Sequence, residues 1–194
     1  MNTPEFRVNW PKVFAAEKND LNGQMEFSVM AVFPKGSDLS AMKADALKAL
    51  VDKFGDRMQD ASFAAALRKP FRKCKEKWKK DPKTGADIIP VGFEDPEATF
   101  INMKSLQKPG VVDQNVQDII EPRGFYAGCY AIASYRAYAY DNKGNRGVSI
   151  GLNNLQKTRD GEPLGGRSAP TSDFQAATPA PGAAASSGAG SVFD

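Results

Sequence analysis

The stretch FYAGCYAIASYRAYAYD, residues 125–141, contains all five tyrosines of this 194-residue chain. Its odd positions from 125 to 139 carry small or apolar side chains and Tyr135, whereas its even positions carry four tyrosines and Arg136. Because side chains alternate between the two faces of a strand, the pattern predicts one small apolar face and one tyrosine-rich face. A straight strand of this length would span about 50 Å. We therefore expect a bend, with Gly128 as the natural place for a bulge.

The next four residues, Asp141-Asn142-Lys143-Gly144, predict a hairpin loop with Gly144 in the left-handed conformation. The resulting register pairs Ala137 with Val148, Tyr135 with Ile150, and Ala133 with Leu152, so the apolar faces coincide. On the other face, Gly147 and Gly151 would lie beside tyrosines and leave their rings uncovered. The hairpin therefore predicts an open aromatic sheet face.

Further strands and helices are predicted on either side of this hairpin. Alternation of apolar and polar residues predicts strands over residues 6–10, 25–33 and 99–104. Apolar residues at helical spacing predict a helix from Asp38, its cap, to Phe54, and a second helical stretch over residues 58–67. Pro70 is expected to open a short basic helix. Residues 81–95 and 108–121 are predicted to be loops.

Four side chains are expected in the interior. Trp10 follows the alternation of the first strand, and Trp78 shares an i, i+3, i+7 stripe with Phe71 and Cys74. Cys74 and Cys129 are expected to be buried as small apolar side chains.

Positive charge is concentrated in one block of the sequence. Nine basic residues lie between Arg68 and Lys83, opposed only by Glu76 and Asp81, so this block carries +7. The whole chain carries +3, which leaves −4 for the remainder. Such a patch favours contact with a polyanion. The alternative is a solvated helix surface.

Several classes of protein are excluded or disfavoured. The chain has no histidine, which removes catalytic triads and His-based zinc sites, and its two cysteines do not form a Cys-x-x-Cys pair. No signal peptide or membrane-spanning run is seen, so we expect a reduced intracellular protein without a membrane partner. The Gly-rich run 161–166 lacks the Lys-Ser/Thr of a phosphate-binding loop. A magnesium cluster would arise only if the fold gathered Asp113, Asp118 and Glu121.

Single-stranded nucleic acid fits the two features that remain. Its phosphates bind cations, and its exposed bases stack on aromatic rings. Candidate DNA-binding residues are Lys69, Arg72, Lys73, Lys75, Lys77, Lys79, Lys80, Tyr126, Tyr130, Arg136, Tyr138, Tyr140 and Arg146. The alternative is that the tyrosines pack under a loop or at a subunit interface. No catalytic residue, metal ligand or cofactor is predicted.

Five blocks in order carry a family resemblance. They are the strand ending in residues 33–35, FPK; 108–113, KPGVVD; 125–130, FYAGCY; 147–152, GVSIGL; and 159–163, RDGEP. Over roughly residues 6–174 the chain resembles a family of tailed-phage single-stranded DNA-binding proteins. The resemblance implies an OB-fold barrel that coats single strands in replication, recombination and repair, in the cytoplasm of the infected bacterial host.

The predicted fold class is therefore β-rich α+β: a five-stranded OB-type barrel with helical insertions and a disordered C-terminal tail. The DNA-binding domain is assigned to residues 1–167 and the Ala/Ser/Gly/Pro-rich tail to residues 168–194. The resemblance implies that the tail recruits phage or host replication proteins, although it carries only Asp173, Asp194 and the chain-end carboxylate beside Phe193. Two alternatives stay open: a magnesium-dependent nuclease or recombination enzyme, and a phage assembly protein that uses the tyrosine-rich strand as its interface. The sequence also leaves a homodimer open.

Overall fold

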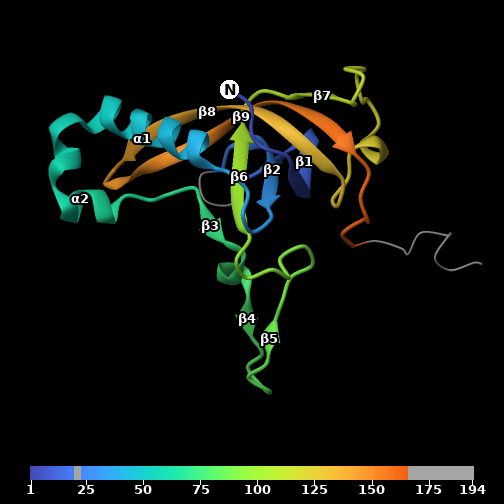
Figure 1. Cartoon of the computed structure of the whole chain (residues 1–194), viewed down its shortest axis with the longest axis horizontal. Coiled ribbons are helices and arrows are strands. Elements are labelled where there is room, and N and C mark those ends of the chain that lie inside the picture. Colours follow the sequence, from blue (N-terminus) through green and yellow to red (C-terminus); the bar gives the residue numbers. More distant parts are fainter. Residues whose placement is uncertain (20–22, 166–194) are drawn as a thin grey trace, which may run out of the picture.

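Five strands close into a barrel in the computed structural model, which describes residues 1–19 and 23–165 (Figure 1). They are β1 (Phe6–Lys18), β2 (Met25–Phe33), β6 (Thr99–Ser105), β8 (Tyr130–Asn142) and β9 (Asn145–Arg159). Neighbouring strands are antiparallel, except that β6 and β9 close the ring in parallel through one pair, Lys104 and Gly151. The predicted five-stranded OB-type barrel is confirmed. The predicted tail, residues 168–194, lies outside the described residues.

The barrel is filled by alternate side chains of its strands. Its buried core includes Phe6, Val8, Val29, Ala31, Phe33, Ile101, Met103, Ala131, Ala133, Tyr135, Ile150, Leu152 and Leu155. The predicted small apolar face of residues 125–141 is therefore the inner face. Tyr135 is the polar exception, because its hydroxyl donates to Asp45 Oδ2 at 2.5 Å. Burial, reinforced by Asp45, raises the pKa of Tyr135 above its ordinary value.

The hairpin of β8 and β9 has a tighter turn than predicted. Lys143 and Gly144 have φ of 51° and 87°, the conformation of a two-residue turn, and Asn142 pairs directly with Asn145. Ala137 consequently pairs with Ile150 rather than Val148, and Tyr135 with Leu152 rather than Ile150, so these two predicted pairs are wrong by two residues. Ala133, beyond the register shift after Ser134, pairs with Leu155 rather than Leu152, an error of three. Between the turn and Ser134, the shift of two leaves the side chains on their predicted faces.

The bend also lies elsewhere than expected. Register shifts occur after Tyr130 and after Ser134 of β8, and β8 begins only after Gly128. Gly128 has φ of 113°, and a Cβ there would lie 2.1 Å from the Glu162 carbonyl oxygen. The absence of a side chain at Gly128 therefore allows residues 160–164 to pack against it, and Gly128 does not form a strand bulge.

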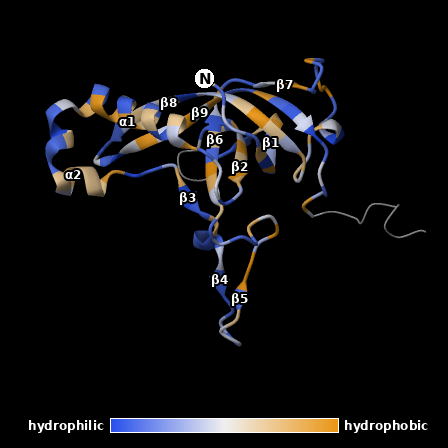
Figure 2. Ribbon diagram, in the orientation of Figure 1, coloured by the Kyte–Doolittle hydropathy of each residue, from blue (hydrophilic) through white to orange (hydrophobic). Residues whose placement is uncertain are grey.

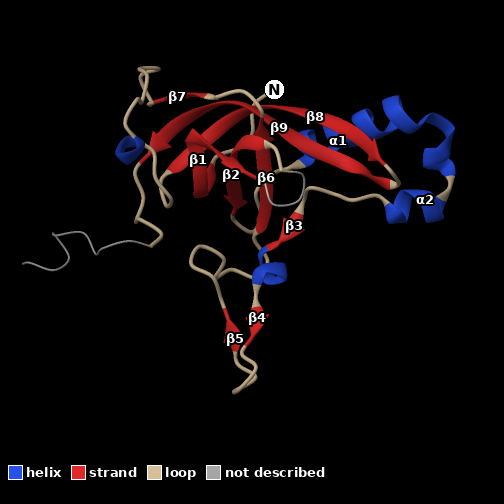
Figure 3. Ribbon diagram, turned by 180° about the vertical axis from the view of Figure 1, so that it is seen from behind, coloured by secondary structure: helices blue, strands red, loops and turns tan. Residues whose placement is uncertain are grey.

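Helices cover one end of the hairpin (Figure 3). They are α1 (Ser40–Phe54), the short 3-10 turn η1 (Gly55–Gln59) and α2 (Ala61–Ala66), so both predicted helical stretches are confirmed. The N-cap residue is Leu39 rather than the predicted Asp38, which lies one residue earlier and accepts a hydrogen bond from the Ser40 amide at 2.9 Å. A second apolar cluster joins these helices to β9 through Ala46, Leu50, Phe54, Leu67 and Val148.

The predicted basic helix is wrong. Residues 68–80 instead form β3 (Arg72–Lys73), the 3-10 turn η2 (Cys74–Lys77) and β4 (Lys79–Lys80). β3 pairs with β6, and Cys74 packs with Met30 and Phe100 on the outside of the barrel. Pairing with a strand distant in sequence thus outweighs the local helical spacing.

A hairpin follows, in which β4 pairs with β5 (Asp87–Ile88) and projects away from the barrel (Figure 1, Figure 2). The residues coloured in Figure 2 show a hydrophilic β4 beside a hydrophobic stretch around β5. Two further short elements are β7 (Gly110–Val112), beside β9, and the 3-10 turn η3 (Pro122–Gly124). The regions predicted as loops therefore contain short strands.

Neither tryptophan lies in the core. Trp10 is 47% exposed, because a register shift between Asn9 and Lys12 interrupts the alternation of β1. Trp78 is half-buried, and its ring N–H donates to the Phe93 carbonyl at 2.9 Å. Both interior assignments are wrong.

Both cysteines are free and fully buried, as predicted. Burial, with the nearby Asp95 and Glu94, raises the pKa of the Cys74 thiol to about 11. We expect neither thiol to react with a disulfide reagent such as DTNB at pH 8, because the thiolate is the reactive species. The same assay in denaturant should release two equivalents. A fast-reacting thiol in the folded protein would contradict this arrangement.

Candidate nucleic-acid interface

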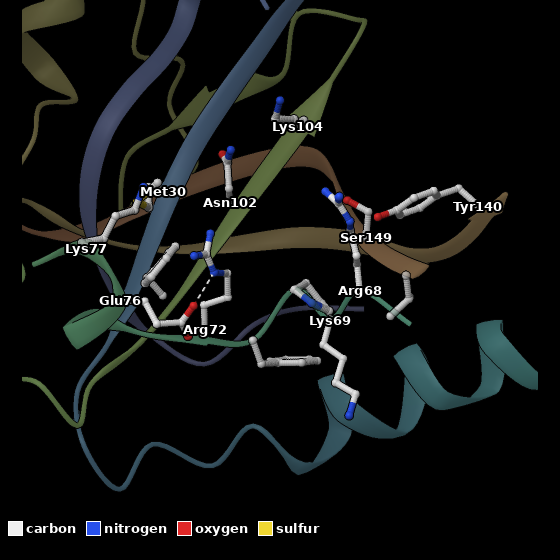
Figure 4. A pocket seen from close by; sticks show the side chains of 14 residues that line it. Met30, Arg68, Lys69, Arg72, Glu76, Lys77, Asn102, Lys104, Tyr140 and Ser149 are labelled. Carbon is white, nitrogen blue, oxygen red and sulfur yellow. Dashed lines mark hydrogen bonds and ion pairs between the residues drawn. The ribbon is translucent and has the colours of Figure 1, made fainter. Parts of the chain in front are cut away.

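Two adjoining cavities form one continuous groove on the outside of the barrel. Their volumes are about 660 and 900 Å³, and both are lined by Lys104, Tyr140 and Ser149. β6 and β9 form the floor, β8 forms one wall, and residues 68–77 form the other wall of the smaller cavity. Figure 4 shows the smaller cavity, with arginine, lysine and tyrosine side chains from separate elements around it. We call this feature the groove.

The β8 wall carries the tyrosine-rich face predicted from the sequence. Arg136, Tyr138 and Tyr140 stand at alternate positions of β8, opposite Gly151, Ser149 and Gly147. A Cβ on Gly151 would meet Arg136 at 3.2 Å and Tyr138 at 3.4 Å, so the absent side chain leaves both room over β9. Tyr138 is 41% exposed, and its ring centre lies 5.8 Å from the Arg136 guanidinium. The wall therefore presents accessible aromatic rings beside a cation.

The opposite wall is cationic. The groove lining contains seven basic residues, Arg68, Lys69, Arg72, Lys77, Lys104, Lys108 and Arg136, and two acidic ones, Glu26 and Glu76. Both acids are already paired, Glu76 with Arg72 at 2.8 Å and Glu26 with Lys104. Burial lowers the pKa of Lys77, with Arg72 and Lys79 adding repulsion. An incoming anion would relieve that repulsion.

Two backbone hydrogen bonds of Arg68 hold the cationic wall to β9. The Arg68 amide donates to the Arg146 carbonyl and the Val148 amide donates to the Arg68 carbonyl, both at 3.0 Å. A Cβ on Gly147 would lie 2.4 Å from the Arg68 oxygen. Only glycine therefore allows this wall to approach so closely.

Gly147→Ala is accordingly expected to lower the free energy of unfolding by about 1–3 kcal/mol, the usual cost of overpacking. Gly151→Ala, on the same strand, is the matched control and should cost less, because its Cβ would meet only movable side chains. Urea unfolding followed by circular dichroism measures both. Equal stability of the two variants would show that the backbone at Arg68 can move away from the added Cβ at little energetic cost.

The groove unites six of the thirteen predicted site residues: Lys69, Arg72, Lys77, Arg136, Tyr138 and Tyr140. The other seven lie elsewhere. Lys73 and Lys75 belong to β3 and η2, and Lys79 and Lys80 to the projecting hairpin. Arg146 pairs with Asp141 at the end of the β8–β9 hairpin, 2.6 Å between Nε and Oδ2.

Tyr126 and Tyr130 face the segment that follows β9. The Tyr126 hydroxyl lies 2.8 Å from Asp160 Oδ1, and burial, followed by Asp160, raises its pKa. The Arg159 guanidinium lies 3.3 Å from the centre of the Tyr130 ring. These two rings are engaged by protein groups outside the groove. Their contact with a nucleic acid stays a prediction.

Sequence reasoning missed part of the groove. Asn102 and Lys104 line its floor, and Ser149, Asn142, Asn153 and Asn154 add polar groups. A signal for the first two was available, because they alternate with buried Ile101 and Met103 along the predicted strand. The strand's outer face could thus have been included.

Acidic side chains do not assemble into a metal site in the part of the chain that the structure covers. The carboxylate of Asp113 instead accepts the amides of Asn115 and Gln117, at 2.8 and 2.9 Å, and stabilises a turn. The condition for the nuclease alternative, a cluster with Asp118 and Glu121, is therefore not met. Within residues 1–19 and 23–165, no helix has the length and apolar character needed to cross a membrane.

Comparison of the sequence with known proteins gives matches to phage proteins. Residues 1–183 match a family described as the ssDNA-binding protein of Enterobacter phage Enc34. A curated relative, protein p50 of Acyrthosiphon pisum secondary endosymbiont phage 1, is 28% identical over 165 residues, covering 82% of this chain and 83% of its own.

Solved structures share the fold. The single-stranded DNA-binding protein of bacteriophage Enc34, in complex with ssDNA, matches with a TM-score of 0.58 and 16% identity, over 84% of this chain and 88% of its own. The single-stranded DNA-binding protein gp2.5 of bacteriophage T7 matches with a TM-score of 0.50 and 13% identity, over 82% of this chain and 91% of its own.

Proposed function

The chain belongs to the family of the Enterobacter phage Enc34 ssDNA-binding protein, and from this premise we propose that it holds single-stranded DNA in the groove. It is a phage single-stranded DNA-binding protein and acts by binding, not as an enzyme. We further propose that it coats single strands without sequence specificity during phage replication and recombination. Its place of action would then be the cytoplasm of the infected host.

One observation carries the proposed binding site: tyrosines and cations without a carboxylate partner line the same groove from separate elements. Among the described residues, Arg68, Lys69 and Lys77 form no ion pair with a carboxylate. Tyr138 and Tyr140 offer rings to bases, and these cations offer charge to phosphates. Stacking is tolerant of sequence because every base has an aromatic face. The groove therefore suits a single strand of any sequence.

The groove also supports a quantitative expectation for salt. If about five phosphates are neutralised, the logarithm of the binding constant should fall with the logarithm of salt concentration with a slope near −3.5. The assembly-protein alternative predicts no such dependence. Recruitment of replication proteins through the tail is a separate proposal, which concerns residues 168–194.

The test is a fluorescence titration of a labelled oligo-dT of about 30 nucleotides, a length that exceeds the site of one OB fold. Binding that weakens with salt and leaves the oligonucleotide intact with Mg²⁺ is the expected result. Shortening of the oligonucleotide only with Mg²⁺ would favour the nuclease. Large assemblies without binding at low salt would favour the assembly protein.

A further inference from the structure

We propose that Trp10 is a base-stacking residue that extends the single-strand path beyond the Lys77 end of the groove. The inference rests on the proposed function, because it assumes that DNA occupies the groove. It adds a contact from β1, a strand that does not line either groove cavity.

The backbone presents Trp10 outward by an unusual conformation. Its φ is 43°, in the left-handed region that bulky residues rarely adopt. The register of β1 against β2 shifts by one residue between Asn9 and Lys12, which turns the tryptophan away from the barrel interior. The carboxamide oxygen of Asn9 accepts the Trp10 amide at 2.9 Å and holds the distortion in place.

Asn9 itself is anchored from a distant part of the chain. It is almost completely buried, and its carboxamide nitrogen donates to the Val91 carbonyl at 3.2 Å. The strained residue is thus fixed by a buried side chain rather than left to relax. Strain that the surroundings maintain is typical of functional positions.

The ring of Trp10 adjoins the cationic wall. Lys77 Nζ lies 5.2 Å from the Trp10 ring centre and 5.1 Å from the centre of Phe100. Lys77 and Phe100 both line the groove, so Trp10 stands directly beyond its end. Phe93 supports the ring at 5.5 Å between centres. Nearly half of Trp10 nevertheless stays exposed.

Trp10 and Lys77 therefore repeat the combination found at Tyr138 and Arg136, an open ring beside a cation. A strand that leaves the groove past Lys77 would place a phosphate near its ammonium group and a base near the indole. A purely structural tryptophan would gain more by burial than by a strained, exposed placement. The geometry favours a DNA base as the group that stacks on the exposed part of the Trp10 ring.

Fluorescence isolates this residue because the chain has two tryptophans, Trp10 and Trp78. In Trp78→Phe, the emission of Trp10 should be quenched by unlabelled oligo-dT, with the concentration dependence that a labelled strand shows by anisotropy. In Trp10→Phe, the remaining emission from Trp78 should change little. Quenching confined to Trp10→Phe would overturn the proposal.

Affinity provides the second readout. Trp10→Ala should weaken oligo-dT binding by roughly 5- to 150-fold, the range for one lost stack, whereas Trp10→Phe should retain most of it. Trp10→Gly should bind oligo-dT as weakly as Trp10→Ala does. Its melting temperature should be no lower than that of the unaltered protein, because glycine accepts this φ without strain. Melting thus separates loss of contact from loss of fold.

Failure of this inference is distinguishable from failure of the proposed function. If Trp10→Ala binds like the unaltered protein while Tyr138→Ala binds weakly, the groove binds DNA and Trp10 does not. If neither substitution changes a measurable affinity, the groove assignment fails together with this extension.

Discussion

Replacing Tyr138 and Tyr140 together with alanine should weaken binding of oligo-dT by at least about 30-fold at 0.1 M salt, because two base stacks of about 1 kcal/mol or more are lost. Both rings line the groove, and Tyr138 is the more exposed. Neither ring belongs to the barrel core, so thermal stability should stay close to that of the unaltered protein. Fluorescence anisotropy and a melting curve measure the two quantities.

Two comparisons make this result specific. Tyr138→Phe with Tyr140→Phe keeps the rings and should bind nearly as well as the unaltered protein, because stacking needs no hydroxyl. Tyr130→Ala removes a tyrosine of the same strand whose ring faces Arg159 outside the groove. If the groove alone binds the strand, this change should alter affinity by less than about twofold, whereas a larger loss would support the predicted contact of Tyr130 with DNA. A large loss in Tyr130→Ala with none in the double alanine variant would move the binding surface to the other end of β8.

Replacing Arg68, Lys69 and Lys77 together with glutamine should reduce the steepness of the salt dependence by about two units, since each lost phosphate contact contributes about 0.7. At 0.1 M salt this corresponds to roughly 100-fold weaker binding, taking affinities at 1 M as equal. The three cations have no carboxylate partner among the described residues, so their replacement breaks no ion pair. Titrations at four or more salt concentrations give the slope.

The projecting β4–β5 hairpin offers a control with the same change of net charge. Lys79, Lys80 and Lys83 replaced with glutamine should alter the slope less, because these lysines lie outside the groove and Lys80 is paired with Asp87 at 2.9 Å. Equal slopes in the two triple variants would mean that only the overall charge matters. If the hairpin variant reduced the slope more than the groove variant does, the phosphates of the DNA would be bound by the hairpin.

Local patterns in the sequence were sufficient for the two faces of the central hairpin. Alternation along β8 assigns Tyr138 outward and Tyr135 inward, and both assignments hold because the register error between the turn and Ser134 is even. The two-residue turn was missed because Lys143 takes a left-handed φ that its side chain does not favour. Face assignment thus tolerated a mistake that would have exposed the core if it had been a shift of one.

Contacts between distant segments explain the remaining errors. The basic segment lies extended because β6 pairs with it, and helical spacing of Phe71, Cys74 and Trp78 could not reveal that partner. Tyr126 is engaged by Asp160, which follows β9 at the other end of the domain. Trp10 was assigned to the core because a single extra residue in β1 reverses the faces that alternation predicts. Pro11, directly after Trp10, was a local signal for this irregularity, because proline within a sheet is confined to edge strands, first positions and bulges.

The parallel contact of β6 with β9 has a consequence for folding. These strands are separated by some 40 residues of chain, and one pair, Lys104 with Gly151, completes the ring. Closing so long a loop carries an entropic cost, so this seam is expected to form late and to open first. Lys104 and Gly151 also line the groove. A strand of DNA that contacts both residues would bridge the two edges of the seam. Because it would bind only the closed barrel, its binding would also stabilise the barrel against opening at this seam.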